Sequence, residues 1–151
     1  MAVAACQDIS IDNYETKSLD EGMIIGVLKQ YKNSRNAFDI SLYLDRMHTN
    51  GRFSLMGDLI LSKSDLEKAL PRFWKRLKMG DTTVYPITRE SITGDFFDRW
   101  DFSNIKISMN HDTARVTVMC TSSWICRQSH FISLEKVNDN WMISETAWEH
   151  F

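Results

Sequence analysis

Apolar and polar residues alternate along the C-terminal third of the chain, and this alternation predicts antiparallel strands joined as hairpins. Two alternating runs flank a polar loop at residues 110–113 and can be paired so that their apolar side chains share one face. The expected pairs are Met109 with Ala114, Ile107 with Val116 and Ile105 with Val118. A slip of one residue would turn all of these side chains toward solvent, so the register is well specified.

The last two strands are predicted to pair around a two-residue turn at Asn138-Asp139, a common hairpin signal. The expected pairs are Lys136 with Trp141, Leu134 with Ile143 and Ile132 with Glu145. A turn around Cys126 would join the two hairpins and would place Ser122 opposite His130.

The N-terminal half carries helical periodicity in place of alternation. Residues 1–17 show little periodicity and are predicted to form a tail or strand-like extension ahead of one domain over residues 18–151. Ser18 and Glu21 have the spacing of a capping box, which begins a helix that runs to about Asn36. The apolar residues of this helix recur at helical spacing: Met23, Ile24, Val27, Leu28 and Tyr31.

A second helix is predicted to begin at a cap formed by Asp39 and to end at Asn50-Gly51, a typical helix C-terminus. The apolar residues assigned to it are Leu42, Tyr43 and Met47. Residues 52–61 follow as a short hairpin with a turn at Gly57-Asp58.

A third helix is predicted to begin at Ser64, which forms a capping box with Glu67, or alternatively at Ser62. This helix must kink or restart at Pro71, because proline lacks the backbone N–H that a helix interior needs. Residues 84–87 suggest another strand, and residues 88–104 carry no clear pattern.

Composition places the chain among ordinary globular domains, with 151 residues, 43% hydrophobic, 25% charged and a net charge of −2. This balance gives no basic patch for nucleic acid, and no apolar run approaches the roughly 18 residues of a transmembrane segment. The three cysteines and four histidines show no paired ligand spacing. We therefore expect no nucleic-acid partner, no transmembrane segment, no metal and no cofactor.

Residues 3–6 (Val-Ala-Ala-Cys) resemble the cleavage box of a bacterial lipoprotein, but a signal peptide needs a charged and apolar segment before that box. Only Met1 and Ala2 precede it. As it stands, the chain is expected to be a soluble cytoplasmic protein. If the chain is a trimmed form of a longer protein, Cys6 would carry a lipid and the protein would belong to the cell envelope.

The order of two helices, a short hairpin, a third helix and a long antiparallel meander resembles the NTF2-like superfamily, which includes SnoaL-like and ketosteroid-isomerase-like proteins. The segments that carry the resemblance are residues 27–31, 35–39, 53–56, 64–66, 112–118, 134–136 and 141–143. The resemblance implies an α+β cone, with three N-terminal helices packed on a curved antiparallel sheet around an apolar pocket, commonly as a homodimer through the sheet. It implies no single activity, because members of the superfamily include isomerases, dehydratases, cyclases and proteins that only bind partners.

The ketosteroid-isomerase comparison can be tested residue by residue. That family stabilises an oxyanion with a tyrosine late in the first helix, and Tyr31 stands at the matching place. Its base is a carboxylate on the strand after the second helix, where residues 53–56 hold none, and residues 132–134 lack its second acid. Without a base there is no proton abstraction at carbon, so this activity is not expected, and whether the chain is another kind of enzyme stays open. Tyr31 is equally explained as a core tyrosine with a bonded hydroxyl.

The predicted register also brings His130 diagonally next to Glu145 on one face of the sheet, about 7–8 Å apart at the backbone. If this face lines the pocket, Glu145 would orient the imidazole and His130 would act as acid or base near neutral pH. The pair could equally recognise a polar ligand, hold the sheet together as a hydrogen-bonded pair, or face outward in a dimer interface.

Further candidate ligand contacts are mostly aromatic, and an aromatic wall would suit a flat hydrophobic ligand. They are Tyr31, Tyr43, Phe53, Phe96, Trp100, Cys120 and Ser122. The same aromatic residues could simply build the core or a dimer interface.

Two functions therefore stay open. The first is binding of a small hydrophobic molecule in an apolar pocket, with acid–base chemistry of the isomerase, dehydratase or cyclase type by His130 and Glu145. The second is a non-catalytic, dimeric module that binds another protein through its sheet. An open pocket with His130 and Glu145 pointing inward would favour the first function, whereas a pocket filled by side chains would favour the second.

Overall fold

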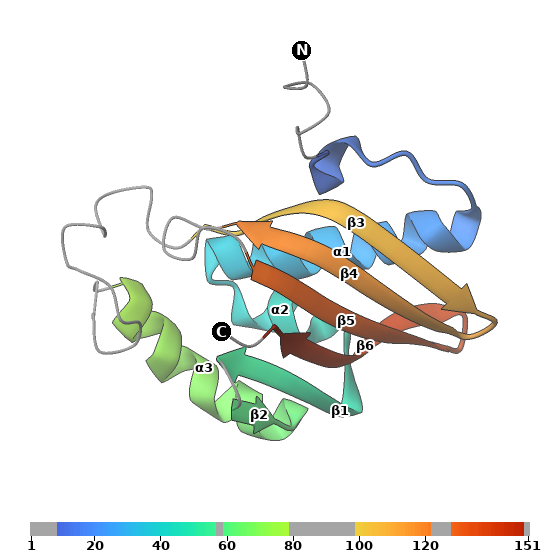
Figure 1. Ribbon diagram of the computed structural model, residues 1–151. Coiled ribbons are helices and arrows are strands. Elements are labelled where there is room, and N and C mark those ends of the chain that lie inside the picture. Colours follow the sequence, from blue (N-terminus) through green and yellow to red (C-terminus); the bar gives the residue numbers. More distant parts are fainter. Residues whose placement is uncertain (1–8, 57–58, 79–98, 122–127, 150–151) are drawn as a thin grey trace, which may run out of the picture.

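Six strands form one curved sheet; α1 packs against one of its faces, α2 packs on α1 and α3, and α3 packs on β1 (Figure 1). The structure is a computed structural model that describes residues 9–56, 59–78, 99–121 and 128–149. Its elements are the 3₁₀ turn η2 (Ile11–Asn13), α1 (Leu19–Ala37), α2 (Ile40–Asp45), β1 (Met47–Met56), β2 (Leu59–Leu61), α3 (Lys63–Lys78), β3 (Asp101–Asn110), β4 (Thr113–Thr121), β5 (Gln128–Val137) and β6 (Asn140–Trp148). The strand order is β2-β1-β6-β5-β4-β3. Helices followed by an antiparallel meander confirm the predicted α+β class.

Helix α1 begins where the capping box predicts it. The Ser18 hydroxyl oxygen accepts the backbone N–H of Glu21 at 3.1 Å, which satisfies one of the free donors of the first turn. The apolar residues Ile24, Leu28 and Tyr31 are fully buried and follow the spacing of one helical face. This face packs on the sheet and carries Tyr31 into the core.

The second helix is shorter than predicted. Asp39 caps α2 as expected, but Met47 already belongs to β1, and Asn50-Gly51 lies inside that strand. The carbonyl of Arg46 accepts the N–H of Ile143 at 2.7 Å, so the chain is drawn into the sheet directly after α2. Pairing with β6, a contact distant in sequence, therefore overrides the local helix-ending signal.

The predicted hairpin at residues 52–61 is confirmed, because β1 and β2 pair antiparallel with Phe53 opposite Leu61. Helix α3 begins at Lys63, and the Ser62 hydroxyl accepts the N–H of Asp65. The alternative cap was therefore correct and the Ser64 cap was wrong. The helix continues through Pro71 without a restart. The strand predicted at residues 84–87 lies outside the described residues.

The first predicted hairpin register is confirmed for two of its three pairs, Met109 with Ala114 and Ile107 with Val116. The ladder then shifts between Ser103 and Lys106, where Asn104 has a φ of 51°. The expected partner of Val118, Ile105, falls inside this irregularity. The shift has the character of a β-bulge on an edge strand.

The last hairpin turns at Asn138 and Asp139, whose φ values of 50° and 64° suit a tight two-residue turn. The pairs Lys136–Trp141 and Leu134–Ile143 are confirmed. Beyond them Ser144 is an extra residue, so that Ser133 pairs with Glu145 and Ile132 pairs with Thr146. The predicted pair of Ile132 with Glu145 was therefore wrong by one residue.

The described part of the predicted N-terminal tail packs on the domain. Ile11 has no exposed surface and belongs to the core, and Ser10 forms an antiparallel bridge with Ser103 at the start of β3. Residues 9–17 then run along the edge of the sheet to the start of α1 (Figure 1).

Gly51 offers a direct test of how closely β1 approaches β6. A Cβ atom at this position would lie 2.3 Å from the ring of Phe53 and 2.8 Å from the carbonyl oxygen of Ser144. We expect Gly51→Ala to lower the free energy of unfolding by about 1–3 kcal/mol, because the strand must shift to relieve the overlap. Urea denaturation followed by circular dichroism measures this change.

Gly26, exposed in α1, is the matched control. A Cβ atom there meets no atom within 4 Å. Gly26→Ala should raise the free energy of unfolding by about 0.5–1 kcal/mol, because alanine loses less conformational entropy in a helix. Equal effects at the two glycines would contradict the close approach of β1 to β6.

Candidate functional site

Five aromatic side chains converge at the end of the sheet where β3 and β5 begin and β6 ends. We call them the aromatic cluster: Tyr31 of α1, Trp100 just before β3, Phe102 of β3, His130 of β5 and Trp148 of β6. The closest pair is His130 and Trp148, whose rings stack with centroids 3.7 Å apart. Tyr31 and Trp100 have centroids 5.6 Å apart, within the usual range of favourable aromatic pairs.

His130 lies at the centre of the cluster and has no exposed surface. Its Nδ1 lies 2.8 Å from the carbonyl oxygen of Ala147, and its Nε2 lies 2.9 Å from the hydroxyl of Tyr31. A carbonyl can only accept, so Nδ1 carries the proton in the neutral ring, and Nε2 accepts from Tyr31. Both nitrogens are therefore satisfied within the protein.

The burial of His130 lowers its pKa from 6.5 to about 3, and the hydrogen bond to the carbonyl of Ala147 only partly offsets this. The imidazole is thus neutral at physiological pH. A base with so low a pKa holds a proton poorly near pH 7, and its one lone pair is already occupied by Tyr31.

The hydroxyl of Tyr31 links several elements of the fold. Besides His130, it is hydrogen-bonded to Tyr43 of α2 and to Thr146 of β6. Burial, together with the neighbouring Tyr43 hydroxyl, raises the pKa of Tyr31 well above its ordinary value. Thr146 in turn accepts the backbone N–H of Ser54 at 3.0 Å, which ties the network to β1.

The structure does not bring Glu145 to His130. The extra residue Ser144 shifts β6 by one position, so Glu145 points to the outer face and is exposed, while Thr146 is buried in its place. A one-residue bulge exchanges the two faces of a strand, and this is why the predicted His–Glu pair was wrong.

The predicted pairing of Ser122 with His130 was also wrong, because His130 pairs with Val118 of β4; the predicted turn around Cys126 lies outside the described residues. Ser122 and Phe96, two of the expected ligand contacts, lie outside the described residues.

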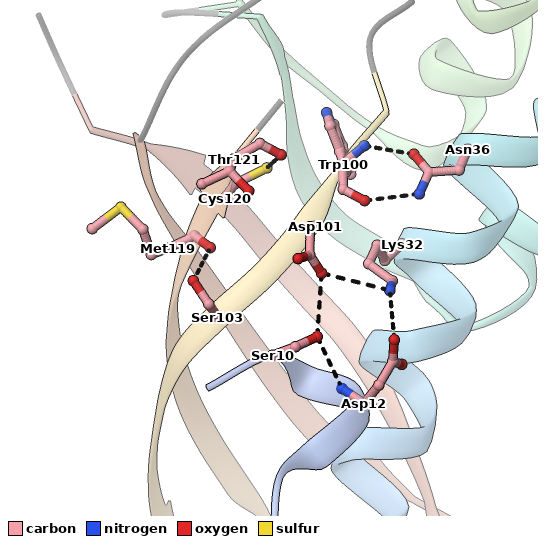
Figure 2. A network of polar contacts seen from close by, with 10 residues as sticks. All are labelled: Ser10, Asp12, Lys32, Asn36, Trp100, Asp101, Ser103, Met119, Cys120 and Thr121. Carbon is pink, nitrogen blue, oxygen red and sulfur yellow. Dashed lines mark hydrogen bonds and ion pairs between the residues drawn. The ribbon is translucent and has the colours of Figure 1, made fainter. Parts of the chain in front are cut away.

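The other expected contacts are mostly core residues. Tyr43, Phe53 and Cys120 are buried, and the ring of Tyr43 stacks on Tyr31 with centroids 5.1 Å apart. Trp100 is half-buried, and its backbone N–H and carbonyl are both held by the side chain of Asn36 at 2.7 and 2.8 Å (Figure 2).

Sequence reasoning missed two residues that the structure brings to this site. Thr146 carries no pattern that points to a buried hydroxyl. Arg35 is 2% exposed and lies over the Trp100 ring, with its guanidinium carbon 4.9 Å from the ring centroid. Arg35 stands four residues after Tyr31 and so continues the buried face of α1; this spacing was the available signal, but a charged residue is seldom assigned to a core.

Three other features of the described part of the chain concern possible sites. An open groove of about 760 Å³ lies between the segment before α1 and strands β3 and β4, beside Tyr14, Lys106 and Val118, and none of the five cluster residues is among those that line it. No group of three or more His, Cys, Asp or Glu side chains within the described ranges is arranged to hold a metal ion. None of the described helices is both long and apolar enough to cross a membrane.

No protein-family model matches the sequence, and no curated protein matches it. Solved structures do match the fold. A protein of unknown function with a cystatin-like fold from Nostoc punctiforme superposes with a TM-score of 0.62 at 18% identity, covering 90% of this chain and 94% of its own. An NTF2-like protein of unknown function from Pseudomonas putida gives a TM-score of 0.65 at 10% identity, covering 89% of each chain.

A third similar structure carries a provisional ketosteroid isomerase name and comes from Shewanella frigidimarina, with a TM-score of 0.57 at 14% identity over 82% of this chain and 92% of its own. At such low identities the likeness shows the fold alone. The chain therefore has an NTF2-like fold, as its sequence resemblance predicted, and these neighbours assign it no reaction.

The buried His130 makes stability depend on pH. The folded-state pKa of about 3 lies below the ordinary 6.5, so the unfolded chain binds a proton first as the pH falls. The stability that this neutral histidine contributes is complete above pH 6.5 and is lost progressively between pH 6.5 and about 3. We expect His130→Gln to reduce the slope of stability against pH in this window by up to about 1.4 kcal/mol per pH unit.

Urea unfolding at half-unit steps between pH 7 and pH 4 measures the slope. His111→Gln, at the exposed tip of the β3–β4 hairpin, is the control and should keep the wild-type slope. If His130→Gln also keeps the wild-type slope, His130 is not held neutral in the folded protein.

Proposed function

We propose that this protein binds a small, flat hydrophobic molecule at the aromatic cluster, and that it does so without acid–base catalysis by His130. The observation that carries the proposal is the uneven exposure of the cluster. Tyr31, Phe102 and His130 are fully buried, whereas Trp100 and Trp148 keep part of their surface exposed. A ligand would therefore stack against the two tryptophans.

The buried members of the cluster support such a site from behind. His130 stacks on Trp148, and Asn36 fixes the backbone of Trp100 through two hydrogen bonds. Trp100 and Trp148 meet edge to face with centroids 5.4 Å apart. Because both rings are held before binding, little conformational entropy is lost when a ligand packs on them.

The chemistry of the cluster favours binding over catalysis. The lone pair of His130 is occupied by Tyr31, and Glu145 lies on the opposite face of the sheet. General acid–base catalysis needs a group that reaches the substrate and changes protonation near the working pH. His130 fails both requirements, and its role in the proposal is to hold the rings in place.

Binding can be measured with the fluorescent probe 1-anilinonaphthalene-8-sulfonate. We expect its fluorescence to rise on addition of the folded wild-type protein, with energy transfer from tryptophan. Trp148→Ala should weaken binding by about tenfold or more, which corresponds to about 1.4 kcal/mol of lost stacking and burial. Near-UV circular dichroism checks that the variant stays folded.

Phe131→Ala is the matched control, because Phe131 is 43% exposed but lies on the outer face of β5. The dissociation constant of the probe should stay within about twofold of the wild-type value. The change expected for Trp148→Ala is larger, about tenfold or about 1.4 kcal/mol. Loss of binding in Phe131→Ala with no change in Trp148→Ala would move the site to the outer face. The absence of any fluorescence rise with the wild type would overturn the proposal.

We also propose that the chain forms a homodimer through the outer face of its sheet. Phe131 supports this second proposal, because its ring is 43% exposed on the outer face of β5, a strand that is paired on both sides and so lies away from the sheet edges. Its partners across the sheet, Thr117 and Ala147, are small and would let a second sheet approach closely.

Light scattering coupled to size-exclusion chromatography tests this arrangement. The wild type should elute with the mass of two chains and Phe131→Glu with the mass of one, because a carboxylate buried in an apolar interface is costly. Leu42→Glu, at an exposed leucine of α2, is the control and should stay dimeric. A Phe131→Glu variant that keeps the wild-type mass would place any dimer contact elsewhere.

A further inference from the structure

The segment that precedes α1, residues 9–17, crosses the edge of β3 and the side of α1; we call it the strap. It is fastened to β3 by one backbone hydrogen bond, from the N–H of Asn104 to the carbonyl of Ile9 at 3.3 Å, and by the bridge of Ser10 with Ser103. Ile11 enters the core between α1 and β3. At its far end Tyr14 donates its hydroxyl proton to Glu21 at 2.7 Å.

A buried lysine joins the strap to both neighbouring elements (Figure 2). The ammonium of Lys32, on α1, lies 3.8 Å from the carboxylate of Asp12 on the strap and 4.0 Å from that of Asp101 on β3. The side chain of Lys32 is only 8% exposed, whereas both carboxylates are more than half exposed. Ser10 adds a long hydrogen bond to Asp101 at 3.4 Å. We call Lys32, Asp12 and Asp101 the clasp.

The clasp holds the strap loosely. Both ion pairs are longer than a hydrogen bond, and within the described residues no hydrogen bond of the Lys32 ammonium reaches a protein acceptor. Ion pairs at these distances to carboxylates that are more than half exposed add little to stability. Burial of Ile11 is therefore the main gain that holds this part of the strap in place. Apart from the hydrogen bond of Tyr14 to Glu21, the polar contacts of the strap to its neighbours are few and long, as in segments that open locally before the whole protein unfolds.

The strap packs beside two elements that carry rings of the aromatic cluster. Its turn η2 contacts β3 and α1, and these two elements carry Phe102 and Tyr31. The rings of Tyr31 and Phe102 have centroids 6.2 Å apart. When Ile11 leaves its position between α1 and β3, the gap between these two elements opens beside the two rings.

We propose that the strap opens as one unit, with the clasp as its latch, and that this opening gives a hydrophobic ligand a lateral route into the aromatic cluster. The route rests on the function proposed above, whereas the opening of the strap does not. The two parts are therefore tested separately, the first without any ligand.

Amide hydrogen exchange followed by NMR tests the latch. Asp12→Asn removes one of the two charges that compensate Lys32, so the strap should open more often. We expect exchange of the Asn104 amide, which is bonded to the carbonyl of Ile9 on the strap, to accelerate by about tenfold or more. The Asn13 amide is bonded to Ser10 within the strap and should keep its rate when the strap opens as one unit. The amides of Val116 and Ile132 in the centre of the sheet should keep the wild-type rate.

Glu145→Gln makes the same chemical change at an exposed carboxylate on the outer face of β6 and should leave all four rates unchanged. Unchanged exchange at Asn104 in Asp12→Asn would show that the clasp is no latch. Equal acceleration at all four amides would show that the strap does not open separately.

A disulfide lock tests the route. Ser10→Cys with Ser103→Cys places two thiols at a bridged strand pair, a separation that a disulfide spans, with Cys6 and Cys126 replaced by serine. The reduced and oxidised forms of this one protein are then matched controls. Stopped-flow mixing with 1-anilinonaphthalene-8-sulfonate should show association at least about tenfold slower in the oxidised form, while the dissociation constant stays within about twofold.

Equal association rates in the two forms would overturn the lateral route and leave the binding proposal intact. The absence of probe binding in both forms would overturn the binding proposal and the route with it, and the exchange experiment would still decide whether the strap opens.

Discussion

The bulge at Ser144 decides which side chains of β6 face the interior. Before it Trp141 and Ile143 point inward, and after it Thr146 takes the inward position. Without the extra residue, the carboxylate of Glu145 would take the buried position of Thr146 beside Tyr31, and removing a carboxylate from water costs several kcal/mol. The bulge therefore keeps the Glu145 carboxylate out of the core and places the Thr146 hydroxyl beside Tyr31.

The same bulge also affects how β1 packs beside β6. The carbonyl oxygen of Ser144 would lie 2.8 Å from a Cβ atom at position 51, so the bulge fits best beside a glycine. Thr146 then accepts the N–H of Ser54, which fixes β1 beside β6 as a parallel neighbour. The aromatic cluster and the β1–β6 pairing thus share one backbone irregularity.

Local signals in the sequence predicted much of this fold. The Ser18 cap, the Asn138-Asp139 turn and the hairpin registers next to each turn depend on residues close in sequence, and the structure confirms them. The end of α2 and the bulge both depend on pairing between β1 and β6, which lie about ninety residues apart, and no local signal marks the end of α2.

The bulge nevertheless left two signs in the sequence. Continuing the alternation from Trp141 and Ile143 would bury Glu145 and turn Trp148 outward, the reverse of what each side chain favours. A change of register between residues 143 and 146 resolves both conflicts at once. The error in the predicted His130–Glu145 pair came from extending a correct register past the point where residue chemistry opposed it.

His130 and Lys32 show two different ways of burying a titratable side chain in one small domain. His130 gives up its charge, and both of its nitrogens find partners, so burial costs little and the ring serves as a fixed wall. Lys32 keeps two carboxylates near it at distances too long for hydrogen bonds. The first arrangement resists opening and lies at the centre of the cluster. The second is held by long ion pairs and lies at the edge, so any motion that admits a ligand should start beside Lys32 and leave His130 in place.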